Sequence, residues 1–184
     1  MKLGRHLDEI CYPFIHQPGA LCDFEVITDE WCTLIGMACS AMPTEMADMA
    51  ADLHHMQPLA FHVNGSIRGR LAVQEADVQW ARARLQHYRN ALGARGDLFV
   101  LPRGTTPVPQ LHQARSGAKK ALRAMVRVEH EGHDVPEVLP RLCNVLCNLL
   151  FVMTLSVNQR RGLQEAPFVS LSYPAAGIKE TLKA

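Results

Sequence analysis

The sequence predicts an all-α protein, and three observations indicate this class. Apolar residues recur every three or four positions through five segments, which is the spacing of one helix face. Alanine, leucine and methionine are plentiful, whereas aromatic residues make up only 6% of the 184 residues, and this composition favours helix. No stretch alternates apolar and polar residues for long enough to predict a sheet. Long helices with short connections pack as an antiparallel bundle.

The first two helices are predicted on either side of a proline. The first covers about residues 29–42 and stops before Pro43, because proline cannot continue a helix. Thr44 is the expected N-cap of the second helix. Pro58 is expected to kink this helix, and the pair Asn64-Gly65 is expected to end it.

The remaining three helices are predicted at about residues 73–92, 108–131 and 134–158. Asp134 and Glu137 resemble a capping box at the start of the last one. The domain prediction that follows has three parts: an N-terminal arm at 1–25, a helical bundle at 26–160 and a C-terminal tail at 161–184.

The composition argues against several function classes. Hydrophobic residues make up 48% and charged residues 20%, a normal globular balance. The net charge of +1 argues against a nucleic-acid partner. The N-terminus shows no apolar stretch of a signal peptide, and the apolar run 142–157 is shorter than a bilayer span. We therefore expect a cytoplasmic protein with no membrane partner.

Cysteines and histidines do not predict a metal site. None of the six cysteines is spaced as CxxC, and two pairs lie inside apolar helical patterns, so buried free thiols in a reducing compartment are expected. His130 and His133 lie near a predicted helix C-terminus, where surface histidines compensate the dipole. Four further side chains that could cluster belong to the N-terminal arm: His6, Cys11, His16 and Cys22.

Three segments, in order, resemble one protein family. Leu101–Thr106 and Leu111–Arg115 are similar to the LPGGT…LHxAR signature of the trimeric ATP:cob(I)alamin adenosyltransferases. Asp29–Gly36 looks like the DELNxxIG helix of that family, and Arg141–Val152 is similar to its NRLSDxLFV helix. The run 150–157 leans towards the ethanolamine-utilisation branch. The resemblance covers about residues 23–160.

The resemblance implies a fold and a reaction. The family has a five-helix chain with a four-helix-bundle core, assembled as a homotrimer with active sites between subunits. Its substrates are a corrinoid such as cobalamin and ATP with Mg²⁺. The cobalt of the reduced corrinoid attacks the 5′ carbon of ATP, and triphosphate leaves. A flavoprotein reductase is the partner expected to supply the electrons.

The resemblance also assigns roles to individual residues. Asp29, Phe99 and Arg115 occupy the positions that act at the corrin: an Asp–Arg ion pair between subunits, and a loop Phe that displaces the lower axial ligand of cobalt. Four residues are expected to bind the triphosphate or line the site: Lys119, Lys120, Asn144 and Asn148. Purely structural roles for some of these residues also stay open. Asp29 can be a first-turn acid favoured by the helix dipole, and the two asparagines can be polar core residues.

Several positions depart from the family pattern. Lys119 and Leu122 stand where the family has Arg and Glu, and Val145 and Asn148 where it has Arg and Asp. Residues 1–22 carry no Gly/Thr-rich ATP loop, although the ethanolamine-utilisation branch also lacks one. Two alternatives to the enzyme therefore remain: a non-catalytic corrinoid-binding protein on the same scaffold, and an oligomeric scaffold that binds no corrinoid.

Overall fold

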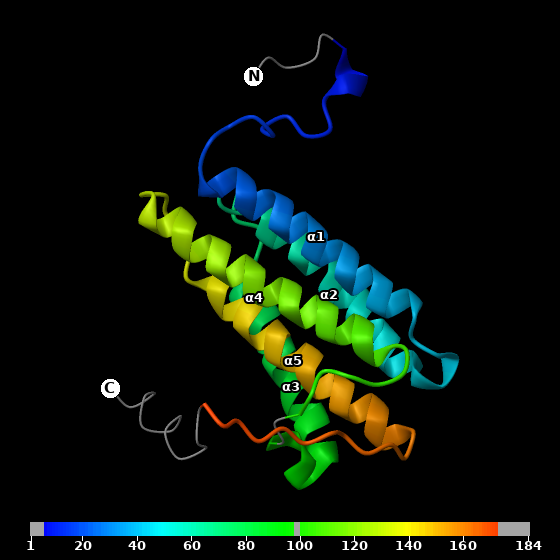
Figure 1. Ribbon diagram of the computed structural model, residues 1–184. Helices are drawn as coiled ribbons and strands as arrows, with labels where there is room; N and C mark the ends of the chain where they lie inside the picture. The colour runs from blue at the N-terminus through cyan, green and yellow to red at the C-terminus, as the bar shows by residue number, and fades with distance from the viewer. Residues whose placement is uncertain (1–5, 98–99, 173–184) are drawn as a thin grey trace.

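The computed structural model describes residues 6–97 and 100–172, and its regular elements are helical (Figure 1). Within these residues the nearest approach to a sheet is an isolated bridge between Val100 and Pro167. The all-α prediction is therefore confirmed. Three short 3-10 helices occur at Leu7–Glu9, Thr44–Met46 and Gly93–Asp97. The α-helices are α1 (Ala20–Ser40), α2 (Ala47–Gly65), α3 (Glu75–Leu92), α4 (Val108–His130) and α5 (Val138–Arg160).

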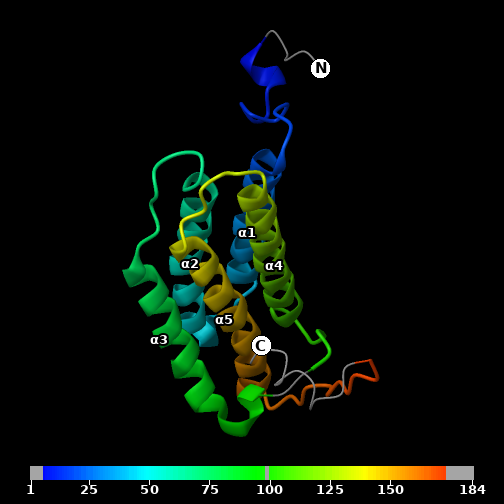
Figure 2. The same ribbon diagram turned by 90° about the vertical axis from the view of Figure 1, so that its left-hand side faces the viewer.

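The α-helices form a bundle whose neighbours are antiparallel except for α3 and α5, which run parallel: Arg141 bonds Glu75 where both helices start, and Gln159 bonds the Ala91 carbonyl where both end. α1 packs between α2 and α4, and α5 packs between α4 and α3. Figures 1 and 2 show α3 at the side of the bundle next to α5, and its buried side chains Val78, Ala81 and Tyr88 belong to the common core. A buried polar contact fastens α3 to α2: Asp52 accepts hydrogen bonds from Tyr88 Oη at 2.6 Å and from Arg84 Nε at 2.9 Å.

The core is apolar and α5 is its most buried helix. Fully buried side chains include Trp31, Leu53, Leu111 and Leu146. Each such side chain contributes about 1.5–3 kcal/mol relative to an exposed one. Among the described helices, only α5 is long and apolar enough to cross a membrane, and 61% of its apolar window is buried by the rest of the protein. Burial of this kind is typical of the central helix of a bundle.

Three predicted helix starts are wrong. α1 begins at Ala20, nine residues before the predicted 29, because the carboxylate of Glu131 accepts the Ala20 N–H at 2.8 Å. A cap from a residue so distant in sequence leaves no local signal. Thr44 begins a 3-10 turn without a side-chain cap. α5 begins at Val138, four residues after Asp134, and no side-chain cap bond forms there.

A close approach fixes how α1 and α4 pack. A Cβ atom placed on Gly117 would lie 2.8 Å from Cδ1 of Trp31 and 3.2 Å from Cδ1 of Leu34. Because real Cβ contacts do not reach 2.8 Å, only glycine allows α4 to lie this close to the Trp31 side chain. Trp31 is fully buried as a result.

The N-terminal arm is anchored by one arginine. Arg68, between α2 and α3, donates to both oxygens of the buried Glu25 carboxylate, at 2.6 and 2.9 Å. The same guanidinium donates to Gln17 at 2.9 Å and lies 4.0 Å from the centre of the Phe14 ring. Arg68 therefore joins the arm, α1 and the α2–α3 connection.

Candidate functional site

Two of the basic residues expected at the site, Arg115 and Lys119, form a cationic stripe on the side of α4 that packs next to α5. Arg115 is half-buried, Lys119 is exposed and Leu122 is half-buried, at the i, i+4, i+7 spacing of one face. The guanidinium carbon of Arg115 lies 5.0 Å from the centre of the Phe151 ring of α5. An aromatic ring at this distance attracts a cation through its quadrupole, which holds the arginine in one orientation.

The two asparagines of α5 lie on the same face as Phe151. Asn144, Asn148 and Phe151 follow the i, i+4, i+7 spacing, and both asparagines are exposed. Asn144 Nδ2 donates to the carbonyl of Pro140 at 3.0 Å, in its own helix. The alternative in which these asparagines are buried polar core residues is therefore wrong. Both are accessible to a ligand or to a second subunit.

A groove of about 430 Å³ continues this face towards the other end of α4 and α5. Its lining is mostly apolar, with Leu122, Val126, Val135 and Pro140 among the residues that form it, and Asn144 at one side. Val126 is 49% exposed. The face therefore combines a cationic part around Arg115 with an apolar part around Leu122.

The structure separates Lys119 from Lys120. Lys120 Nζ lies 3.2 Å from the Glu30 carboxylate of α1, and both side chains are exposed. It lines a cavity of about 420 Å³ between α1 and the start of α4, together with Glu30, Ser116 and His112. An exposed pair of this kind contributes about 0–1 kcal/mol, so it can open to release the lysine.

His112 is a residue whose importance the sequence did not reveal. It is 6% exposed, and its Nδ1 atom has no hydrogen-bond partner among the described residues. Burial, with a smaller effect from the nearby positive charge of Arg115, lowers the pKa of His112 to about 4. The imidazole is therefore neutral at pH 7. Only its place in the Leu111–Arg115 motif singles it out in the sequence.

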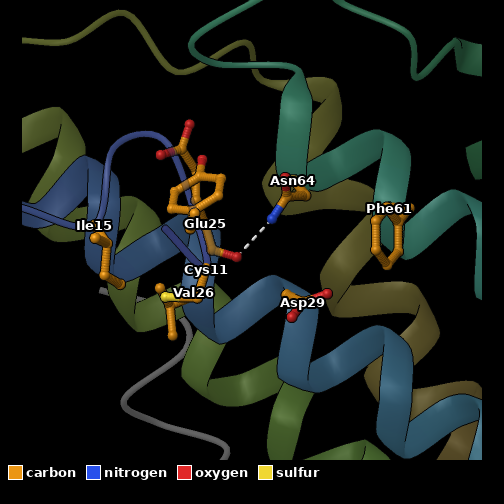
Figure 3. A pocket seen from close by; sticks show the side chains of 8 residues that line it. Cys11, Ile15, Glu25, Val26, Asp29, Phe61 and Asn64 are labelled. Carbon is orange, nitrogen blue, oxygen red and sulfur yellow. Dashed lines mark hydrogen bonds between the residues drawn. The ribbon is translucent and has the colours of Figure 1, made fainter. Parts of the chain in front are cut away.

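Asp29 lies on a different face of the protomer. It is exposed on α1 and lines a cavity of about 400 Å³ with Phe61 and Asn64 of α2 (Figure 3). Figure 3 shows Asn64 donating to the backbone carbonyl of Glu25 at the back of this cavity. Burial and the neighbouring Glu25 raise the pKa of Tyr12, another lining residue, to about 12. With two carboxylates and no cation in its lining, this cavity is unsuited to phosphate.

Asp29 and Arg115 therefore cannot form an ion pair within one chain. Asp29 is on the α2 side of α1, whereas Arg115 is on the α5 side of α4. α1 and α4 themselves lie between these two faces. The pair that the sequence predicted requires a second protomer.

The motif loop is tied to the C-terminal segment. Leu101 N–H donates to the carbonyl of Ala166 at 2.9 Å, and Arg161 donates to Oγ1 of Thr105 at 3.1 Å. Gly104 has φ 156, and a Cβ there would lie 2.9 Å from Val108. Phe99, the predicted corrin-side residue of this loop, lies outside the described residues. Among the described residues, no group of three His, Cys, Asp or Glu side chains could hold a metal ion.

Helices and site together define a class: a five-helix bundle whose α4 carries a half-exposed cationic stripe beside a Pro-Arg-Gly-Thr loop. The family model "Cobalamin adenosyltransferase" matches residues 25–157. A cobalamin adenosyltransferase of Cupriavidus metallidurans is 31% identical over 136 residues, which are 73% of this chain and 72% of that one. The chain belongs to the cobalamin adenosyltransferase family, a family of transferases.

Solved structures show the same fold. A PduO-type ATP:corrinoid adenosyltransferase from Lactobacillus reuteri, a phenylalanine-to-alanine variant complexed with cobalamin and ATP, superimposes with a TM-score of 0.73. The two chains are 18% identical, and the match covers 82% of this chain and 87% of that one. An arginine-to-lysine variant complexed with ATP has the same TM-score at 19% identity, over 82% and 87% of the two chains.

Proposed function

We propose that this protein transfers the 5′-deoxyadenosyl group of ATP to the cobalt of a reduced corrinoid such as cobalamin. The observation that carries the proposal is the orientation of Arg115 over Phe151, one helical turn before Lys119, on an accessible face of a cobalamin adenosyltransferase bundle. An oriented guanidinium and a neighbouring ammonium suit a triphosphate that gains negative charge as it leaves.

The reaction consists of one displacement. The electron pair of Co(I) forms the bond to the 5′ carbon of ATP, the carbon–oxygen bond breaks, and triphosphate leaves with that bonding pair. Arg115 and Lys119 stabilise the charge that develops on the leaving oxygens. A separate reductant, for which we propose a flavoprotein, supplies the electron that makes Co(I) from Co(II). Phe99 is proposed to contact the lower face of the corrin.

Magnesium is proposed to arrive with the triphosphate. The α4 stripe offers it no ligand, because Leu122 has an apolar side chain where the family has a carboxylate. Asn144 and Asn148 present amide oxygens on the accessible face of α5. We propose that these asparagines contact the nucleotide side of the site, and that Lys120 joins them when its exposed pair with Glu30 opens.

The site is proposed to form between subunits of a cytoplasmic homotrimer. The separation of Asp29 and Arg115 on different faces supports this assembly, because two protomers can bring the pair together. The apolar groove beside Leu122 offers surface for such a contact. We further propose that the chain belongs to the ethanolamine-utilisation branch of the family, because residues 150–157 resemble that branch.

The decisive experiment measures adenosylcobalamin formation. Cob(II)alamin, a chemical reductant and MgATP are incubated with the protein without oxygen, and the absorbance of adenosylcobalamin and the release of triphosphate are followed. We expect Arg115→Ala to abolish most of the rate. Arg82→Ala, an exposed arginine of α3, is the matched control and should leave the rate unchanged.

Calorimetric titrations with MgATP and with cobalamin, each alone, separate the alternatives. If wild type binds cobalamin but forms no adenosylcobalamin, the chain is a non-catalytic corrinoid-binding protein. If it binds neither, the bundle acts as a scaffold and the proposal is wrong.

A further inference from the structure

Two arginines without an acidic partner lie at the motif loop. Arg103 is an exposed residue of the loop and lines a cavity of about 370 Å³, together with residues 163–166 of the C-terminal segment. Arg161, directly after α5, donates from Nη1 to Oγ1 of Thr105 at 3.1 Å, and Thr105 lines the same cavity. Neither arginine forms an ion pair with a carboxylate among the described residues. Their charges therefore remain available to a bound anion.

The one carboxylate of the described lining is already neutralised. Glu165 is the acidic residue of this cavity, its side chain is only 5% exposed, and its Oε2 accepts from Arg95 at 2.7 Å. The positive charge of Arg103 and Arg161 therefore has no counterion there. The cavity beside Asp29 has the opposite character, with two carboxylates and no cation in its lining. Of the two cavities, only the one at the motif loop suits an anion.

The position of Arg103 departs from the signature that the loop resembles. The LPGGT signature has glycine where Arg103 stands. Gly104 keeps the second glycine, and a Cβ atom there would lie 2.9 Å from Val108. The loop thus retains the glycine that its packing requires and gains an exposed charge that its packing does not require. A guanidinium binds phosphate and carboxylate groups through two parallel N–H···O bonds.

We propose that Arg103 and Arg161 bind an oxyanion carried at the edge of the corrinoid. The inference rests on the proposed function, in which Phe99 of the same loop contacts the lower face of the corrin. Two kinds of oxyanion occur at the edge of corrinoids: a phosphate, on the side chain that leaves the lower face towards the nucleotide base, and carboxylates, on ring side chains that have not been amidated. The phosphate is the group that we expect, because it lies on the side of the ring assigned to the loop.

Three corrinoids without a lower base test the inference by calorimetric titration in the absence of ATP. Cobinamide has an uncharged edge, cobinamide phosphate adds the phosphate alone, and cobyrinic acid carries carboxylates. We expect wild type to bind cobinamide phosphate at least about fivefold more tightly than cobinamide. Arg103→Ala should remove most of this preference without changing the affinity for cobinamide. Arg103→Lys keeps the charge but not the planar fork, so it should retain part of the preference.

Controls separate the bound charge from general effects. Arg82→Ala removes an exposed arginine of α3 and should preserve the preference. Raising the ionic strength from about 0.05 to about 0.5 M should weaken the preference of wild type, because salt screens exposed charges. Arg161→Gln removes the second charge, while its amide can still donate to Thr105, and it should also reduce the preference. Thermal melting of each variant shows whether it is folded.

The outcomes distinguish the two proposals. If wild type prefers cobyrinic acid but not cobinamide phosphate, and Arg103→Ala removes that preference, the oxyanion is a carboxylate. Equal affinities for the three corrinoids, or a preference that Arg103→Ala and Arg161→Gln leave unchanged, overturn the oxyanion inference and leave the proposed function standing. Binding of none of the three by wild type contradicts the proposed function itself.

Discussion

Arg115 of α4 and Phe151 of α5 form a cation–π contact, with the guanidinium carbon 5.0 Å from the ring centre. Both side chains are half-buried, so the contact is partly shielded from water. A cation–π contact in such a position contributes about 0.5–2 kcal/mol. The two residues lie on neighbouring helices of the core, and the position of the arginine therefore depends on how α4 and α5 pack.

Phe151→Leu should lower the adenosylation rate while leaving the fold intact. The shorter side chain keeps the apolar contact but lets Arg115 rotate into solvent, so we expect kcat to fall about threefold to thirtyfold, the equivalent of the lost contact. Phe151→Tyr keeps the ring and should retain most of the activity. Steady-state kinetics with thermal melting of each variant tests this, and equal rates for Leu and Phe at position 151 would contradict it.

His112 should make the stability depend on pH. Its pKa is about 4 in the folded chain, against about 6.5 for a histidine in water, so the unfolded chain binds more protons between these values. The stabilisation is fully present above pH 6.5 and is lost as the pH falls towards 4. Wild type should lose up to about 2 kcal/mol more than His112→Leu between pH 7 and pH 5. Urea unfolding at both pH values measures this difference, and parallel losses would show that His112 is not the group responsible.

Two weakly active variants should regain activity when their subunits are exchanged. In a mixed trimer of Asp29→Asn and Arg115→Ala chains, one of the three sites receives both wild-type residues, so a 1:1 mixture should regain up to about a quarter of the wild-type rate. Each variant alone is expected to be weakly active. The chains are mixed, partly denatured, refolded and assayed, and a light-scattering mass shows the assembly. A mixture no more active than its components would show that an Asp29–Arg115 pair between subunits has no role in the reaction.

Gly117→Ala should destabilise the bundle. Its Cβ would lie 2.8 Å from Cδ1 of Trp31, and α1 and α4 must move apart to admit it. Overpacking of this kind costs about 1–3 kcal/mol. Gly65→Ala is the matched control: Gly65 ends α2, and no atom lies within 4 Å of an added Cβ there. Chemical denaturation of both variants tests the contrast, and equal stabilities would mean that the close approach carries no energetic weight.

The sequence predicted the class of fold because helical periodicity depends on each helix alone. α4 was predicted within one residue, since Pro107 and the apolar seam define it locally. The start of α1 was missed because its cap, Glu131, is 111 residues away. Likewise, the four-residue spacing of Arg115 and Lys119 was enough to predict that they share one face of a helix. The partner of Arg115, the ion pair of Lys120 and the burial of His112 arise from contacts between helices, which no single helix encodes.

The hydrogen bond from Leu101 to Ala166, the bridge from Val100 to Pro167 and the reach of Arg161 to Thr105 join the motif loop to the chain after α5. These contacts couple the two segments, so a displacement of one would break hydrogen bonds to the other. The segment after α5 therefore stabilises the conformation of the motif loop. A truncation before Ala166 would remove these contacts and make the loop more mobile, although the deleted residues are more than 60 positions away from it in the sequence.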